Sequence, residues 1–234
     1  MNIQLQKEIE KLNRQILALS AKVENDLRLA VRAADNQDEK LAQEVVNREA
    51  LTNTMEVNVE EECLKILALH QPVASDLRYI VAVLKINQDL ERIGDLAVHI
   101  AERAVFLCSQ PRVAIPVRLE QMATMTEELL KKVLDAFVNL DENAAREVCA
   151  ADNDVDNMNQ EIFQQVKEAI IKNPQMFEPL LQIMHIARHL ERIADHATNI
   201  AEDLIYLIEG RIVRHAPEIT RIKSESIPRR PPAC

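Results

Sequence analysis

The sequence predicts an all-α protein: two tandem three-helix bundles with six long antiparallel helices. One basis is an internal repeat: residues 90–102 read LERIGDLAVHIAE, and residues 190–202 read LERIADHATNIAE. Nine of these thirteen positions are identical at an offset of 100. The other basis is that apolar residues recur three and four positions apart along most of the chain, the spacing of amphipathic helices. A repeat this long indicates a duplicated domain rather than a short-repeat solenoid.

Turn residues divide the helical pattern into segments. Asp38 and Asp141, which match at an offset of 103, each stand where an aspartate side chain would cap the next helix. Gly210 follows the last apolar helix residue, where a left-handed cap is expected. Prolines fall mainly between segments. The expected helices span residues 4–35, 39–69, 73–108, 117–139, 142–172 and 178–209.

The two copies meet at the stretch 109–116, which carries two prolines and is the natural domain boundary. We therefore expect a first bundle over residues 1–110 and a second over 111–215. Residues 216–234 end in SESIPRRPPAC and are polar and rich in Pro and Arg. This composition predicts a flexible C-terminal tail.

Composition excludes several classes of function. Two glycines in 234 residues leave no Gly-rich loop for a nucleotide phosphate. Aromatic residues make up 3% of the chain and Trp is absent, so platforms for stacking bases are not expected. With 28 Lys and Arg against 38 Asp and Glu, the net charge of −10 disfavours nucleic acid and anionic lipid. No apolar run is long enough to cross a membrane, and the first residues show no signal-peptide core, which predicts a cytoplasmic protein.

Acidic side chains form stripes along the third helix of each copy. At 100° per residue, Glu91, Asp95 and His99 lie on one face, away from the apolar side of the helix. Acidic positions on the preceding helix form a second stripe, and adjacent antiparallel helices could bring the two stripes together. A solvated helix face is the simple interpretation. Carboxylates four residues apart repel each other, however, and a hard cation such as Mg, Ca, Mn or Fe would remove that repulsion. Arg92 and Arg192 could also neutralise part of the charge.

The remaining histidines and the glycine within the repeat have simpler interpretations. His185 and His189 are spaced to hold zinc, yet they lie off the acidic stripe, and an interior or boundary position is expected for His189. His99 is the one histidine on the stripe. Gly94 within a helix indicates close approach of a neighbouring helix. No Ser/His/Asp or Cys/His grouping appears, and the Glu-x-x-His pairs of a di-iron oxidase are missing from the repeat. The sequence therefore predicts a protein that is not an enzyme.

At DLERIGDLAVHIAE and HLERIADHATNIAE the chain resembles the PhoU family, the accessory regulators of bacterial phosphate transport. The runs QPVASDLRYIVAVLKI, LDAFVNLDENAAREV and IYLIEGRIVRHAPE support the resemblance, which covers roughly residues 5–215. It implies a tandem pair of three-helix bundles, often a homodimer. It also implies a cytoplasmic protein associated with inner-membrane complexes through its partners, the ATPase of the phosphate ABC transporter and the sensor histidine kinase of the phosphate regulon. In that role it restrains phosphate uptake and keeps the regulon off.

Some members of the family hold iron or zinc on their E-x-x-x-D stripes, which implies Fe, Zn or another divalent cation as a cofactor here. His99 stands where Asn or Asp is common, and Glu49 stands where Asp is common; both keep ligand capacity. The expected metal ligands are Glu91, Asp95, His99, Glu191, Asp195, Asn199, Asp152, Asp156 and Glu49. Two alternatives stay open: a divalent-metal store or carrier that uses the same stripes, and a metal-dependent hydrolase with two adjacent cations.

Overall fold

The computed structural model describes residues 3–111 and 117–211. The expected tail at 216–234 and most of the expected linker lie outside these ranges. Every regular element within them is helical, and together the elements form two bundles in tandem, as the sequence predicts. The elements are α1 (Ile3–Asn36), α2 (Glu39–Asn47), α3 (Glu49–His70), α4 (Ala74–Cys108), α5 (Val117–Asn139), α6 (Glu142–Lys172), the short 3₁₀ helix η1 (Pro174–Met176) and α7 (Phe177–Glu209).

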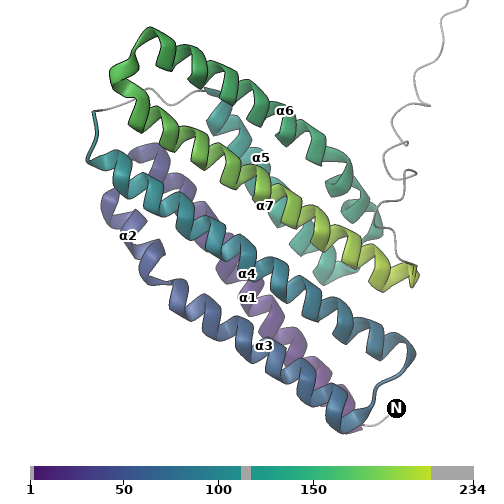
Figure 1. The fold of residues 1–234 in the computed structure, drawn as a ribbon. Helices are drawn as coiled ribbons and strands as arrows, with labels where there is room; N and C mark the ends of the chain where they lie inside the picture. Colours follow the sequence, from purple (N-terminus) through teal and green to yellow (C-terminus); the bar gives the residue numbers. More distant parts are fainter. Residues whose placement is uncertain (1–2, 112–116, 212–234) are drawn as a thin grey trace, which may run out of the picture.

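The third helices of the two bundles form the interface between them. Figure 1 shows α4 and α7 side by side in the middle of the molecule, with α1 to α3 on one side and α5 and α6 on the other. The contact between α4 and α7 is the most extensive between any two of these elements, and α1 also touches α5. The repeated LERI segments therefore lie at the centre of the molecule, where the two copies meet.

The helix ends follow the expected turn chemistry. The carboxylate of Asp38 accepts a hydrogen bond from the Leu41 backbone N–H at 3.1 Å, and Asp141 accepts one from Ala144 at the same distance. Gly210 ends α7 with a φ of +72°, and its N–H donates to the Tyr206 carbonyl at 2.8 Å. These three capping predictions are confirmed.

The second expected helix is divided. Where the sequence pattern predicts one helix over 39–69, α2 ends at Asn47 and α3 begins at Glu49, with Arg48 between them. The Nε atom of Arg48 lies 3.4 Å from a carboxylate oxygen of Asp26, which is buried on α1 and also pairs with Lys22. Apolar spacing continues on both sides of the break, so the periodicity carries no sign of it.

Each long helix buries an apolar stripe in one continuous core. The largest fully buried side chains include Leu12 and Ile16 of α1, Leu90 and Ile100 of α4, and Met122 of α5. Burial of each such side chain is worth about 1.5–3 kcal/mol, which holds the helices together along their whole length. None of the helices in the described ranges is long and apolar enough to span a membrane.

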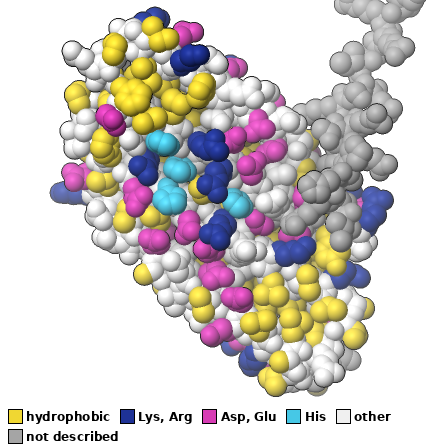
Figure 2. All heavy atoms as spheres, in the orientation of Figure 1, with side chains coloured by type: hydrophobic (Ala, Val, Ile, Leu, Met, Phe, Trp, Pro, Cys, Tyr) yellow, Lys and Arg dark blue, Asp and Glu magenta, His cyan; other side chains and the backbone are white. Residues whose placement is uncertain are grey.

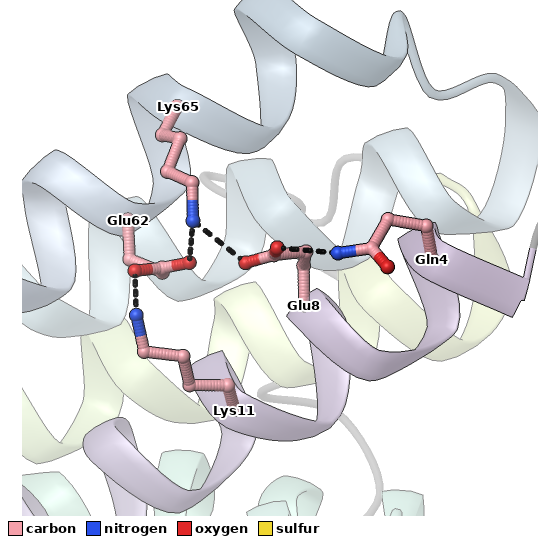
Figure 3. A network of polar contacts seen from close by, with 5 residues as sticks. All are labelled: Gln4, Glu8, Lys11, Glu62 and Lys65. Carbon is pink, nitrogen blue, oxygen red and sulfur yellow. Dashed lines mark hydrogen bonds and ion pairs between the residues drawn. The ribbon is translucent and has the colours of Figure 1, made fainter.

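A polar network ties α1 to α3 (Figure 3). Glu62 of α3 is buried and accepts hydrogen bonds from Lys11 of α1 and, at 3.1 Å, from Lys65. Lys65 also donates to Glu8 of α1 at 2.8 Å, and Gln4 donates to Glu8 at 3.0 Å. A buried carboxylate is tolerated only when it is paired in this way, so the network fixes how α1 and α3 lie against each other.

Candidate functional site

The acidic stripes of the first bundle meet where α3 packs closely on α4. A Cβ added to Gly94 would lie 3.0 Å from the methyl carbon of Thr52, so the glycine permits this approach, as the sequence predicts. Asn87 of α4 donates to the Glu56 backbone carbonyl at 3.1 Å and to its carboxylate at 3.0 Å. Burial raises the pKa of Glu91, and the charges of Asp95 and Glu56 raise it further. The charge of Glu56 therefore reaches Glu91 from the neighbouring helix.

Arg92 neutralises part of this first acidic group. Its Nε atom lies 3.3 Å from a Glu91 carboxylate oxygen, and one of its terminal nitrogens lies 3.7 Å from Asp95. Both carboxylates keep part of their surface exposed. Glu49, the expected ligand on the neighbouring helix, is the half-buried first residue of α3. Arginine thus compensates some of the repulsion between the carboxylates, as the sequence suggested for Arg92.

The second bundle gathers four carboxylates, which we call the α6–α7 acid cluster: Asp152 and Asp156 of α6, and Glu191 and Asp195 of α7. Burial, together with the charges of Asp195 and Asp156, raises the pKa of Asp152 to about 6. The pKa of Glu191 is likewise raised by burial and by Asp195 and Asp156, and that of Asp195 by burial and by Asp156. The expected convergence of acidic stripes from two adjacent helices therefore occurs in this bundle as well.

The donor chemistry of the α6–α7 acid cluster suits a hard divalent cation. Carboxylate oxygens are the ligands such ions prefer. One carboxylate oxygen of Asp152 is buried without a hydrogen-bond partner, and a group left in that state normally has a missing partner. The side chains are not yet arranged around a common point, because residues 3–111 and 117–211 contain no group of three or more His, Cys, Asp or Glu placed to hold an ion. Binding would require rotation of these side chains.

The two remaining expected ligands lie elsewhere. The ring of His99 packs on that of His189 of α7, with 5.4 Å between centroids and a tilt of 32°. Asn199 donates to Asp89 of α4 at 3.3 Å. Both residues therefore make their recorded contacts across the boundary between α4 and α7, which we call the seam, and not with the carboxylates of their own bundles.

Sequence reasoning missed the polar contacts of the seam. Asp89 lies 2.8 Å from His196 Nδ1, and Lys85 pairs with the buried Asp203 at 3.0 Å. A signal was present: at an offset of 100, Asp89 matches His189. Burial, together with the nearby charge of Arg103, lowers the pKa of His189 to about 4. The seam therefore has a part around Asp89 that contains carboxylates, and a part around His189 in which an uncharged imidazole lies near Arg103.

Comparison with known proteins shows what this arrangement resembles. The family model described as PhoU domain matches twice, over residues 16–104 and 119–204. The chain is 39% identical to the phosphate-specific transport system accessory protein PhoU homolog of Pseudomonas aeruginosa, over 95% of this chain and 92% of that protein. It is 34% identical to the Escherichia coli phosphate-specific transport system accessory protein PhoU, over 91% of this chain and 88% of that one.

Solved structures give the same result. The crystal structure of PhoU from Pseudomonas aeruginosa superposes with a TM-score of 0.86 at 37% identity, covering 88% of this chain and 99% of that one. The phosphate transport system regulatory protein PhoU from Streptococcus pneumoniae superposes with a TM-score of 0.83 at 28% identity, covering 89% of this chain and 99% of that one. The likeness thus extends over both bundles and includes the way they pack together.

Proposed function

Because this chain belongs to the PhoU family, we propose that it is an accessory regulatory protein of a phosphate-specific transport system. The double match of the family model, one in each bundle, carries this proposal. In the specific form we propose, the protein is a non-catalytic cytoplasmic adaptor. It joins the ATPase of the phosphate ABC transporter to a membrane sensor histidine kinase, restrains uptake and keeps the phosphate regulon off.

Exposed apolar side chains support an adaptor role. The first bundle exposes Leu64, Leu69 and Val73, and the second exposes Phe163 and Phe177. Figure 2 shows hydrophobic side chains gathered near both ends of one face, with charged side chains between them. Exposed patches of this kind often mark contact surfaces. Each bundle can therefore offer a separate surface, to two different partners or to one partner and a second copy in a homodimer.

We further propose that the α6–α7 acid cluster binds Fe, Zn or another divalent cation, with Asp152, Asp156, Glu191 and Asp195 as its ligands. When bound, the ion would supply positive charge among four carboxylates whose proximity raises the pKa values of Asp152, Glu191 and Asp195. Rotation of these side chains about the ion would tighten the packing of α6 on α7. The state of the second bundle, and hence its contact surface, would then depend on metal.

The adaptor proposal is tested by measuring binding of the purified protein to the purified ATPase and to the kinase's cytoplasmic portion, each by surface plasmon resonance. We expect Phe163→Ser and Leu64→Ser each to weaken binding to one partner at least tenfold. Ala68→Ser, at an exposed small residue of α3, is the matched control. Absence of binding to both partners would refute the adaptor proposal, while tight stoichiometric metal without either partner would favour a metal store or carrier.

The metal proposal is tested by elemental analysis of protein purified without a metal-affinity tag, beside the Asp95→Asn/Asp195→Asn variant. We expect stoichiometric Fe, Zn or Mn in the parent protein and its loss in the variant. No metal in either sample would identify the stripes as a solvated or partner-binding face and would leave the adaptor proposal standing.

A further inference from the structure

A group of nitrogen-bearing side chains lies on the seam. We call it the seam cluster and define it as His99 and Arg103 of α4 with His189 of α7. The rings of His99 and His189 are in contact, and the charge of Arg103 acts on His189. Figure 2 shows histidine and Lys or Arg side chains gathered along the middle of this face, with acidic side chains on either side.

Two polar atoms of the seam cluster are buried without a hydrogen-bond partner: Nε of Arg103 and Nδ1 of His189. The Nε atom of an arginine is always a donor, so an acceptor is missing beside it. The side-chain oxygen of Gln182 accepts from another Arg103 nitrogen at 3.4 Å and leaves the Nε atom without an acceptor. A buried donor left unpaired costs about 1–3 kcal/mol, which a bound acceptor would recover.

Because the chain is duplicated, the residues around Arg103 can be compared with the matching residues of the other copy. At the offset of 100, the carboxylate of Asp89 corresponds to His189, and the carboxylate of Asp203 corresponds to Arg103. In the Asp89 part of the seam, each carboxylate has a nitrogen partner: His196 Nδ1 at 2.8 Å for Asp89 and Lys85 at 3.0 Å for Asp203. In the corresponding part, neither carboxylate is present, and Arg103 stands where the other part has Asp203. The acceptor oxygens of one half of the seam are thus replaced by nitrogen groups in the other.

We propose that the seam cluster is a binding site for a small, doubly charged tetrahedral oxyanion, with Arg103 and His189 as its principal donors. Such an anion has several oxygens and can accept from the Arg103 Nε and from the histidines at once. His99 is exposed, so the site is open to solvent from its α4 side. The site rests on the side chains of the seam alone and does not depend on the proposed adaptor function or on metal in the acid clusters.

The test is isothermal titration calorimetry of the full-length protein with inorganic phosphate, with sulfate, and with sodium chloride at matched ionic strength. The side-chain ¹⁵N signals of the histidines are followed by NMR in the same titrations. We expect phosphate to bind saturably and to shift the signals of His189 and His99, and Arg103→Gln to weaken binding at least tenfold. Lys85→Gln, which removes a cation from the corresponding part of the seam, is the matched control and should bind as the parent does.

His189→Gln is a second variant, in case Arg103→Gln fails to fold by circular dichroism, and it too should weaken binding. Equal binding of phosphate and sulfate supports a general oxyanion site, whereas binding of phosphate alone identifies phosphate as the ligand. Shifts that chloride reproduces, or equal weakening in Lys85→Gln and Arg103→Gln, would overturn the proposal, since either result means only non-specific attraction of anions.

Discussion

Asp152 gives a direct test of whether the α6–α7 acid cluster is strained in the absence of a cation. Its pKa is raised from 3.8 to about 6, chiefly by burial and then by Asp195 and Asp156. Each pKa unit corresponds to about 1.4 kcal/mol, so the ionised carboxylate would cost roughly 3 kcal/mol. The side chain is only half-buried, and screening by solvent lowers this to about 1–2 kcal/mol. Asp152→Asn should therefore stabilise the metal-free protein by about 1–2 kcal/mol at pH 7.5.

The pH dependence follows from the direction of the shift. Because the folded-state pKa lies above the unfolded value, the folded protein binds the proton more tightly between pH 3.8 and about 6. Stability contributed by Asp152 is therefore full below that range and is lost as the pH rises through it. The gain in Asp152→Asn should then be present at pH 7.5 and absent at pH 4.

The assay is urea unfolding followed by circular dichroism at 222 nm, with EDTA present. Asp154→Asn, at an exposed acid on the same helix, is the matched control and should change the free energy of unfolding by less than about 0.5 kcal/mol. The reasoning fails if Asp152→Asn is no more stable than Asp154→Asn at pH 7.5, or if its gain is the same at both pH values.

Three further predictions concern the fold and use the same unfolding assay. Gly94→Ala should destabilise the protein by about 1–2 kcal/mol, because its Cβ would press on the buried Thr52 methyl group, and adding Thr52→Ser should restore most of the loss; a more stable single variant would contradict the close approach. Asp38→Ala and Asp141→Ala should each cost about 1 kcal/mol through loss of a helix cap, and no change in either would show that the caps do not contribute. Leu90→Ala should cost about 2–5 kcal/mol because Leu90 is fully buried at the centre of α4, and a value near zero would place it outside the core.

Most of the fold could be predicted from the sequence because its determinants are local. Apolar spacing, prolines and capping residues lie within a few positions of the helix ends they set, and the ends of α5 and α6 agree with the predicted ones to the residue. The break at Arg48 could not be predicted in this way. Its recorded long-range partner is Asp26, a buried residue on another helix, and nothing in the local sequence indicates that ion pair.

The candidate site was predictable in part for the same reason. Spacing on one helix shows which residues share a face, so the gathering of Glu191 and Asp195 with acids of the preceding helix followed from the pattern. Residue spacing along one helix does not show which of its side chains will contact the other bundle. His99 lies on the same computed stripe as Asp95, yet its ring packs on His189 because α7 crosses beside it. One face of α4 therefore carries Asp95 in the acidic stripe and His99 against α7.

The duplication separates two kinds of position on the central helices. The residue pairs Glu91/Glu191 and Asp95/Asp195 are identical in both copies. In each copy, burial and the charge of the aspartate raise the pKa of the glutamate. Seam positions occur twice as well, but the carboxylates of Asp89 and Asp203 correspond to His189 and Arg103. Because α4 and α7 pack against each other, each seam residue faces the other copy, so a charge that is balanced on one side need not be balanced at the corresponding place. The stripes thus place the same carboxylates in both bundles. At the seam, by contrast, one copy can carry a carboxylate where the other carries a histidine or an arginine.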